Sequence, residues 1–275
     1  MTRVVKLEEP FKALWANLDV FKAVDELQGD IYRAVSTRRT LRTEFNGRGY
    51  FVKIHKGVGW REILKNLLTF RLPVLGARSE WEAIKRLNSL GIDTMRAAAF
   101  GQRGWNPAKR ESFLITEELA PTISLEDYCH DWPQVPPEPS FKRALIKRVA
   151  QIARRMHQGG VNHRDFYLCH LLLHLSPPPD STDFRLSVID LHRAQLRPAT
   201  PRRWQDKDLA GLNFSALNIG LTQRDRLRFL RVYFEASLSE TLHTQGKRLN
   251  DLERESNRLL ARYTRKYAPR KPEKS

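Results

Sequence analysis

Three side chains far apart in the sequence have the chemical types that phosphoryl transfer requires. Lys53 ends an apolar stretch, Asp165 follows His163-Arg164, and Asp190 comes after an apolar run that starts at Leu186. A lysine can bind the α- and β-phosphate oxygens of ATP, one aspartate can orient a hydroxyl and accept its proton, and a second can hold Mg²⁺. This combination predicts transfer of the γ-phosphoryl group of ATP to a hydroxyl.

The first part of the chain has the alternating pattern of a small antiparallel sheet. We expect a hairpin turn at Asn46-Gly47, because both residues tolerate positive φ. A helix is expected at 79–90, with Ser79 as N-cap and Glu82 in a capping box, and an amphipathic helix at 11–27. The expected strands are 31–35, 40–45, 50–55, 97–100 and 112–116. The result would be a five-stranded sheet with one main helix.

Beyond Glu118 the pattern becomes mostly helical. Ser140 is expected to cap a long amphipathic helix that ends at Gly159-Gly160, and further helices follow the apolar run ending at Ile189. The fold class is therefore α+β, with residues 1–118 as a β-rich N-terminal lobe that carries Lys53 and the main helix. Residues 119–275 form a larger helical lobe with the catalytic and metal loops.

Two segments carry a resemblance to a known family. The sequence HRDFYLCH at 163–170, together with VIDLH at 188–192, resembles the bacterial lipopolysaccharide core heptose(I) kinases of the protein-kinase-like superfamily. The resemblance extends from about Gly29 to Ala216. It implies a two-lobe protein-kinase-like fold and ATP-dependent phosphorylation of a heptose in the lipopolysaccharide inner core. A kinase acting on protein or on another small molecule is the alternative.

The same resemblance assigns roles to further residues. Arg164 and Asp165 belong to the catalytic loop, and Glu80 is the helix acid that pairs with Lys53, with Glu82 as the second candidate. The resemblance also implies that the backbone of Glu117 and Leu119 meets the adenine of ATP. Asp208 would brace the catalytic loop from below.

Three positions depart from the wider kinase pattern. The turn at 36–40 contains Arg38 where kinases have a glycine-rich loop, so hydroxyl and guanidinium groups must contact the phosphates. His170 stands where kinases place a metal-binding Asn, so it is a candidate ligand beside Asp190, although Mg²⁺ prefers oxygen. Asp190-Leu191-His192 replaces Asp-Phe-Gly.

The charge distribution indicates an anionic partner. The chain of 275 residues has 48 Lys and Arg against 31 Asp and Glu, a net charge of +17, of which +9 lies in Arg33 to Arg78 and +6 in the tail from Gly246. An anionic glycolipid, the lipopolysaccharide inner core, fits this charge without further assumptions. A nucleic-acid-binding protein would not need Lys53, Asp165 and Asp190 together.

The expected location is the cytoplasmic side of the inner membrane, with peripheral contact. No stretch has the roughly 18–20 consecutive apolar residues of a spanning helix, and two cysteines are too few for a disulfide framework. The amphipathic segment 57–77, with Arg61, Lys65 and Arg71, either lies on the membrane surface or packs on the fold. Zinc is disfavoured, because His163, Cys169, His170 and His174 lack paired metal-ligand spacing.

Overall fold

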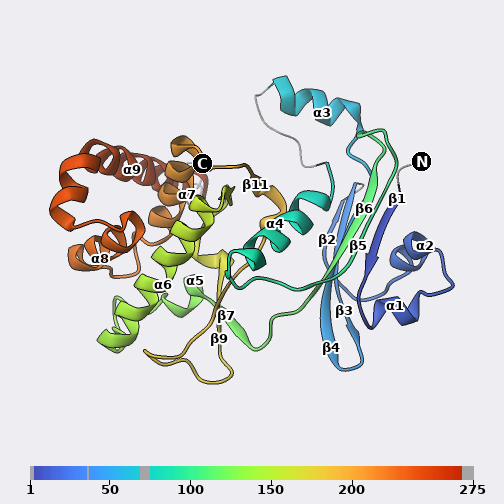
Figure 1. The fold of residues 1–275 in the computed structure, drawn as a ribbon, viewed down its shortest axis with the longest axis horizontal. Coiled ribbons are helices and arrows are strands. Elements are labelled where there is room, and N and C mark those ends of the chain that lie inside the picture. Colours follow the sequence, from blue (N-terminus) through green and yellow to red (C-terminus); the bar gives the residue numbers. More distant parts are fainter. Residues whose placement is uncertain (1–2, 36, 69–74, 268–275) are drawn as a thin grey trace, which may run out of the picture. The chain divides into compact units, whose positions relative to one another are not determined.

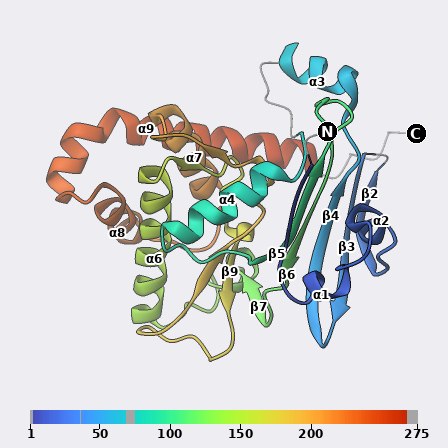
Figure 2. The same cartoon turned by 45° about the vertical axis from the view of Figure 1, so that its right-hand side comes forward.

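The computed structural model describes residues 3–35, 37–68 and 75–267. The chain forms two compact units, one comprising residues 1–120 and 187–195 and the other residues 121–186 and 196–275 (Figures 1 and 2). The segment that contains Asp190 therefore belongs to the first unit, although it follows most of the second in sequence.

The first unit is built on a six-stranded antiparallel sheet. Its strand order is β1-β5-β6-β4-β3-β2. The strands are β1 (Arg3–Leu7), β2 (Asp30–Val35), β3 (Arg38–Phe45), β4 (Arg48–His55), β5 (Ala97–Arg103) and β6 (Glu111–Glu117). Asn46 and Gly47 both have positive φ, 51° and 72°, so the predicted β3–β4 hairpin turn is confirmed.

The prediction of five strands was wrong, because β1 adds a sixth at the edge of the sheet. β1 pairs with β5, and it buries little of its surface. Its sequence, RVVKL, is short and carries two cations, so it lacks a clear alternating pattern. Pairing with a strand some hundred residues away, rather than local sequence, stabilises it.

Two short helices cover one face of the sheet. The single helix expected at 11–27 is interrupted, giving α1 (Phe11–Leu14) and α2 (Val20–Asp25), and the Asp19 carboxylate caps α2 by accepting from the Phe21 N–H at 3.0 Å. Their buried residues share one core cluster with the sheet side chains of Leu41 and Val52.

The opposite face carries the main helix of this unit, α4 (Arg78–Ser89) (Figure 2). The Trp81 ring stacks on Phe100 of β5, with ring centroids 4.4 Å apart. The predicted N-cap, Ser79, was wrong, since the helix starts at Arg78 after Ala77 without a side-chain cap. A further helix of this unit is α3 (Gly59–Leu68), and η2 (Leu191–Arg193) follows Asp190.

The second unit is mostly helical. Its helices are α5 (Leu125–Tyr128), α6 (Pro139–Gln158), α7 (Arg202–Ser215), α8 (Gln223–Phe234) and α9 (Leu238–Tyr267), with the short 3₁₀ turn η1 (Leu168–His170). β7 (Thr122–Ser124) pairs antiparallel with β9 (Leu171–His174), and β8 (Val161–Asn162) also belongs to this unit. Two further short strands, β10 (Leu186–Val188) and β11 (Gln195–Leu196), lie where the chain passes into and out of the segment 187–195 of the first unit.

The N-cap of the long helix α6 lies two residues before the expected one. The Glu138 carboxylate, not Ser140, caps the helix by accepting from the Phe141 N–H at 2.8 Å, and Gly159 ends it as predicted. Within the described part of the chain, none of the helices has the length and apolar character needed to span a membrane.

Candidate active site

The central strand β4 positions Lys53. Lys53 lies opposite Thr40 on β3 and Leu114 on β6, and His55 lies opposite Arg38. Directly opposed residues of antiparallel strands share a face, and so do residues two apart on one strand. Arg38, Lys53 and His55 therefore lie on one face of the sheet. Arg39 lies on the other face, where its guanidinium donates to the Asp25 carbonyl at 2.7 Å.

Lys53 forms an ion pair with Glu80 of α4. The Lys53 Nζ lies 2.6 Å from the Glu80 Oε1, and the two side chains are only 13% and 1% exposed. Glu82 instead pairs with Arg78 on the exposed side of the helix at 2.7 Å. Of the two acids considered from the sequence, Glu80 is thus the one that lies beside the lysine.

Asp190 lies at the same lysine. Its Oδ1 is 3.6 Å from the Lys53 Nζ and 2.7 Å from the His192 Nδ1. Its backbone is left-handed, with φ 59° and ψ 50°, a conformation that costs a non-glycine residue free energy and is common at functional sites. Lys53, Glu80 and Asp190 come together within the first unit.

Hydrogen bonds hold the Asp190 segment in the first unit. The Val188 N–H donates to the Asp93 carbonyl at 2.9 Å, and the Thr94 hydroxyl donates to the Val188 carbonyl at 2.6 Å. On the other side of Asp190, the Ser79 hydroxyl donates to the His192 carbonyl at 3.3 Å. Because hydrogen bonds fix the backbone on both sides of Asp190, its carboxylate has a defined position relative to Lys53.

His55 stays uncharged beside these cations. Burial, together with the electrostatic effect of Arg38, Lys53 and His192, lowers its pKa to about 3. A neutral imidazole adds no further positive charge to the face that carries Lys53.

Asp208 of α7 anchors the loop that carries His163, Arg164 and Asp165. The Asp208 carboxylate is 1% exposed and accepts from the His163 N–H at 2.7 Å and from the Arg164 N–H at 2.8 Å. Arg164 has φ 73°, so this carboxylate stabilises a strained backbone directly before Asp165. The bracing role expected of Asp208 is visible in these two hydrogen bonds.

A buried network supports Asp208 in turn. The His157 Nε2 lies 3.3 Å from an Asp208 oxygen, and its Nδ1 lies 2.8 Å from the Tyr233 hydroxyl. Burial raises the pKa of Tyr233, so the phenol remains protonated and can donate. Nothing in the sequence around His157 indicates these partners.

His170 contacts the backbone of the catalytic aspartate candidate. Its Nδ1 lies 2.6 Å from the Asp165 carbonyl oxygen, and its ring stacks on His163 with centroids 5.6 Å apart. A carbonyl oxygen only accepts, so Nδ1 carries the proton. Among the described residues, no group of three or more His, Cys, Asp and Glu side chains is arranged to hold a metal ion.

Glu117 and Leu119 lie at the end of β6 in the first unit. The Glu117 N–H donates to the Arg96 carbonyl at 2.9 Å, and its carboxylate lies 3.3 Å from the Arg96 guanidinium. Glu118, between them, forms an ion pair with Arg42 at 2.7 Å. These contacts fix the backbone that leads to Leu119.

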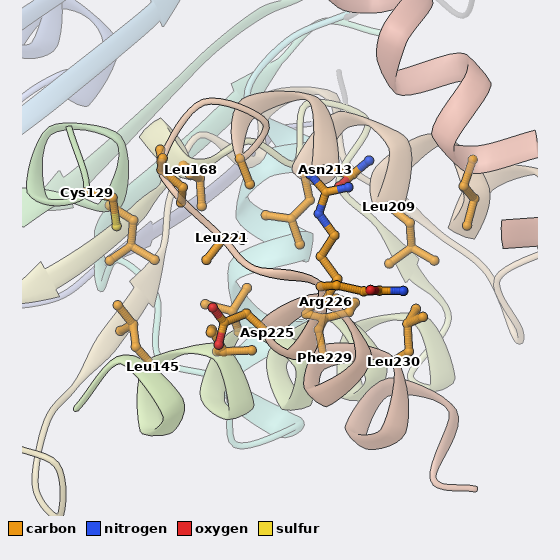
Figure 3. Close-up of a pocket in the computed structure, with 18 of the residues that line it drawn as sticks. Cys129, Leu145, Leu168, Leu209, Asn213, Leu221, Asp225, Arg226, Phe229 and Leu230 are labelled. Atoms are coloured by element: carbon orange, nitrogen blue, oxygen red, sulfur yellow. The ribbon is translucent and has the colours of Figure 1, made fainter. Parts of the chain in front are cut away.

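The second unit contains a large apolar cavity that sequence analysis did not predict. It has a volume of about 640 Å³ and lies among α5, α6, α7, α8 and α9. Figure 3 shows Leu145 of α6, Leu209 of α7 and Phe229 of α8 among its lining residues. Cys129 also lines it, and burial raises the pKa of this thiol to about 12. Amphipathic helices indicate only that apolar faces are covered, not that a cavity remains between them.

Two arrangements in this chain are those expected of a kinase-like phosphotransferase. One is the buried lysine–glutamate pair beside an aspartate, and the other is the His-Arg-Asp loop braced by a buried carboxylate. The lipopolysaccharide core heptose(I) kinase WaaP of Pseudomonas aeruginosa is 59% identical over 259 residues, covering 94% of this chain and 97% of that protein. WaaP of Escherichia coli strain K12 is 52% identical and covers 96% of this chain and 99% of its own length.

A solved structure, described as WaaP in complex with acyl carrier protein, matches with a TM-score of 0.84 and 54% identity, covering 93% of this chain and 99% of that one. A family profile described as lipopolysaccharide kinase (Kdo/WaaP) matches residues 22–233. The chain belongs to the lipopolysaccharide kinase (Kdo/WaaP) family. The family resemblance and the kinase-like α+β fold are confirmed, and as a kinase the protein uses ATP as co-substrate.

Proposed function

We propose that this kinase transfers the γ-phosphoryl group of ATP to a hydroxyl of heptose I in the lipopolysaccharide inner core. The Lys53–Glu80–Asp190 cluster carries the proposal, and the names of relatives 52–59% identical to this chain supply the acceptor. The relatives give no support to a protein or small-molecule acceptor.

Lys53 and Glu80 act together on the nucleotide. Glu80 holds the ammonium group of Lys53 in place, and Lys53 binds α- and β-phosphate oxygens. Arg38, on the same face of β3 and β4, adds a guanidinium for the phosphates. At the end of β6, the Glu117 carbonyl and the backbone of Leu119 bind the adenine.

Asp190 is the group that holds Mg²⁺. Its carboxylate has the oxygen chemistry that Mg²⁺ prefers, and such ions are commonly held by one or two carboxylates together with substrate phosphates and water. When bound, the ion neutralises charge on the phosphates. His170 fits less well as a ligand. Its nitrogen is a poor ligand for Mg²⁺, and its Nδ1–H already donates a hydrogen bond to the Asp165 carbonyl. We assign His170 to positioning of the loop.

Asp165 accepts the proton of the acceptor hydroxyl. The hydroxyl oxygen attacks the γ-phosphorus, and the bond between this phosphorus and the leaving oxygen of ADP breaks. Asp208 and the left-handed Arg164 fix the direction in which Asp165 is presented. The residues 1–120 with 187–195 then serve as the nucleotide-binding lobe and the other unit as the catalytic-loop lobe.

The test uses labelled ATP, Mg²⁺ and a heptose-containing core that lacks phosphate on its heptoses. Wild-type protein should label the core lipid, and Asp165→Asn should not, while an unrelated protein and an aminoglycoside remain unlabelled. Label on the protein or the drug, with none on the core, would refute the acceptor assignment.

We further propose peripheral contact with an anionic membrane through α3. Trp60, Leu64 and Leu68 recur every four residues and are 54%, 54% and 81% exposed, while Ile63 is buried. Residues four apart share a helix face, so these three form an apolar stripe that faces solvent. The cations Arg61 and Lys65 belong to the same helix; Arg71 lies outside the described residues.

Replacing Trp60, Leu64 and Leu68 together by Ser should abolish sedimentation with vesicles that contain anionic lipid. The matched control replaces the exposed apolar residues Leu14 and Leu18, near α1, by Ser. Equal sedimentation of both variants would assign α3 to another role.

A second candidate function concerns the cavity of the second unit. We propose that this chain, like the solved relative, binds an acyl carrier protein, and that the cavity receives its acyl chain. Its apolar lining and its size suit a flexible hydrocarbon chain. Acylated carrier protein should raise the melting temperature and the unacylated form should not. Leu212→Trp, which fills the cavity, should remove the difference; an equal effect of both carrier forms would refute the proposal.

A further inference from the structure

Four cations surround one indole ring in the second unit. The distances from the charged groups to the Trp204 ring centroid are 4.5 Å for Lys207, 5.1 Å for Arg203, 5.4 Å for Arg197 and 5.9 Å for Arg164. The face of an indole ring attracts a cation weakly, through the negative charge of its π electrons. The ring therefore brings four cationic side chains together without neutralising their charge.

Two exposed cations of the cluster lie on α7. Arg203 and Lys207 are exposed, and neither takes part in an ion pair among the residues that the structure describes. Burial lowers the pKa of Arg197, and the charge of Arg203 lowers it further, so these two guanidinium groups repel each other. The first turn of α7, which carries Arg203 and Trp204, contains no acidic residue. The local field is thus positive from several elements at once.

The cluster is fixed rather than spread over a mobile surface. The Arg197 guanidinium donates to the side chain of Asn162, a residue with no exposed surface. Arg164 is held at its backbone by Asp208, and it directly precedes Asp165. A group bound by these cations would lie at a set position relative to the catalytic loop, within the same unit.

We propose that the Trp204 cluster, consisting of Arg164, Arg197, Arg203, Trp204 and Lys207, binds a carboxylate or phosphate group of the acceptor glycolipid and thereby positions the acceptor at Asp165. The inference rests on the proposed function, which supplies an anionic acceptor. Guanidinium groups suit it because they bind carboxylate and phosphate with two parallel hydrogen bonds while they stack on an aromatic ring. The cluster selects for acidic groups beside the heptose.

The key experiment measures acceptor binding without nucleotide, so it does not depend on turnover. Equilibrium dissociation constants are determined by calorimetry for the core acceptor and for the same acceptor with its carboxylates esterified and its phosphates removed. The variant Arg203→Gln/Lys207→Gln removes two exposed charges outside the catalytic loop. Its control, Arg224→Gln/Arg231→Gln, removes two exposed cations of α8 that form no ion pair among the described residues.

The wild type and the control should bind the acidic acceptor at least about tenfold more tightly than the neutralised one, and Arg203→Gln/Lys207→Gln should lose most of this preference. The difference in this preference between the wild type and the variant should become smaller as the salt concentration is raised, because salt screens the two exposed charges. In turnover, the KM for the acceptor should rise while the KM for ATP stays the same.

Three results would overturn the inference: equal binding by the variant and the control, no preference of the wild type for the acidic acceptor, or a rise in the KM for ATP alone, which would assign the cluster to the nucleotide. Competition by inorganic phosphate as strong as that by the acceptor would reduce the site to a general anion site. Binding that depends on the cluster without any phosphorylation of the core would leave this inference standing and refute the proposed function instead.

Discussion

Removing the positive charge of Lys53 should destabilise the first unit as well as abolish activity. In Lys53→Met, the Glu80 carboxylate remains buried at 1% exposure without its cation, and its Oε2 has no hydrogen-bond partner among the described residues. Breaking a buried ion pair by removing one partner costs about 3–5 kcal/mol. Since 1.4 kcal/mol is a factor of ten, local opening of β4 and α4 should increase by about 100-fold or more.

A double replacement separates stability from function. Lys53→Met/Glu80→Met leaves no buried charge of this pair and fills the space with apolar atoms, so stability should return to within about 1–2 kcal/mol of wild type. Nucleotide binding and turnover should remain lost, because no cation contacts the phosphates. Lys56→Met is the matched control: its pair with Asp25 is exposed, so the expected loss is only about 0–1 kcal/mol.

The assay is hydrogen exchange of peptides from β4 and α4, which reports local opening without assuming that both units unfold together. Exchange should be fastest in Lys53→Met, within about 30-fold of the wild-type rate in the double variant, and close to the wild-type rate in the control. The reasoning fails if Lys53→Met exchanges as slowly as wild type, or if the double variant is no better protected than Lys53→Met.

Three further predictions concern the loop and the sheet. Asp165→Asn should lower kcat by about 10²–10⁴-fold with little change in the KM for ATP, and a normal kcat would exclude it as the base. Asp208→Asn replaces one of two acceptors for the His163 and Arg164 N–H groups, so steady-state assays should show a kcat at least about tenfold lower, and hydrogen exchange should show a loop destabilised by about 1–3 kcal/mol; unchanged values would contradict the bracing role. The low pKa of His55 means that the folded state disfavours its protonation, so its stabilising contribution is complete above about pH 6.5 and declines as the pH falls toward 3. Between pH 7 and 4, wild type should lose up to about 3 kcal/mol more stability in urea unfolding than His55→Leu, and parallel pH profiles would refute this.

Features set by neighbouring residues were predictable from the sequence. The Asn46-Gly47 turn and the Gly159 helix end follow from backbone preferences of those residues, and both are present. Helix starts were predicted less well. A serine was expected as the N-cap of both α4 and α6, but Glu138 caps α6 and no side chain caps α4. Several polar residues near each helix start could act as the N-cap, and tertiary contacts select among them. Ser79 instead donates to His192.

The candidate site was predictable where its residues lie in recognisable motifs. Lys53, Glu80 and Asp190 were assigned from spacing and resemblance. In the structure, the carboxylates of Glu80 and Asp190 both lie within 4 Å of the Lys53 ammonium group. The His157–Tyr233 support of Asp208 and the surroundings of Trp204 were not found, since their members come from separate elements. In both cases the contacts depend on how helices pack, and no short sequence pattern records that packing.

The net charge along a segment also differs from the charge that a partner meets. Residues 33–78 carry +9 by count, yet three of the eleven cations in this segment pair with acids from outside it: Arg42 with Glu118, Lys53 with Glu80, and Lys56 with Asp25. Because these partners lie elsewhere in the sequence, a local count overestimates the attraction that this stretch exerts on an anion. The cations around Trp204 belong to no such basic run, but Arg203 and Lys207 form no ion pair in the described part of the chain. Cations that form no ion pair among the described residues, such as Arg203 and Lys207, are therefore a better guide to an anion site than a local count of charge, and they are the reason for proposing that the Trp204 cluster binds the acidic acceptor.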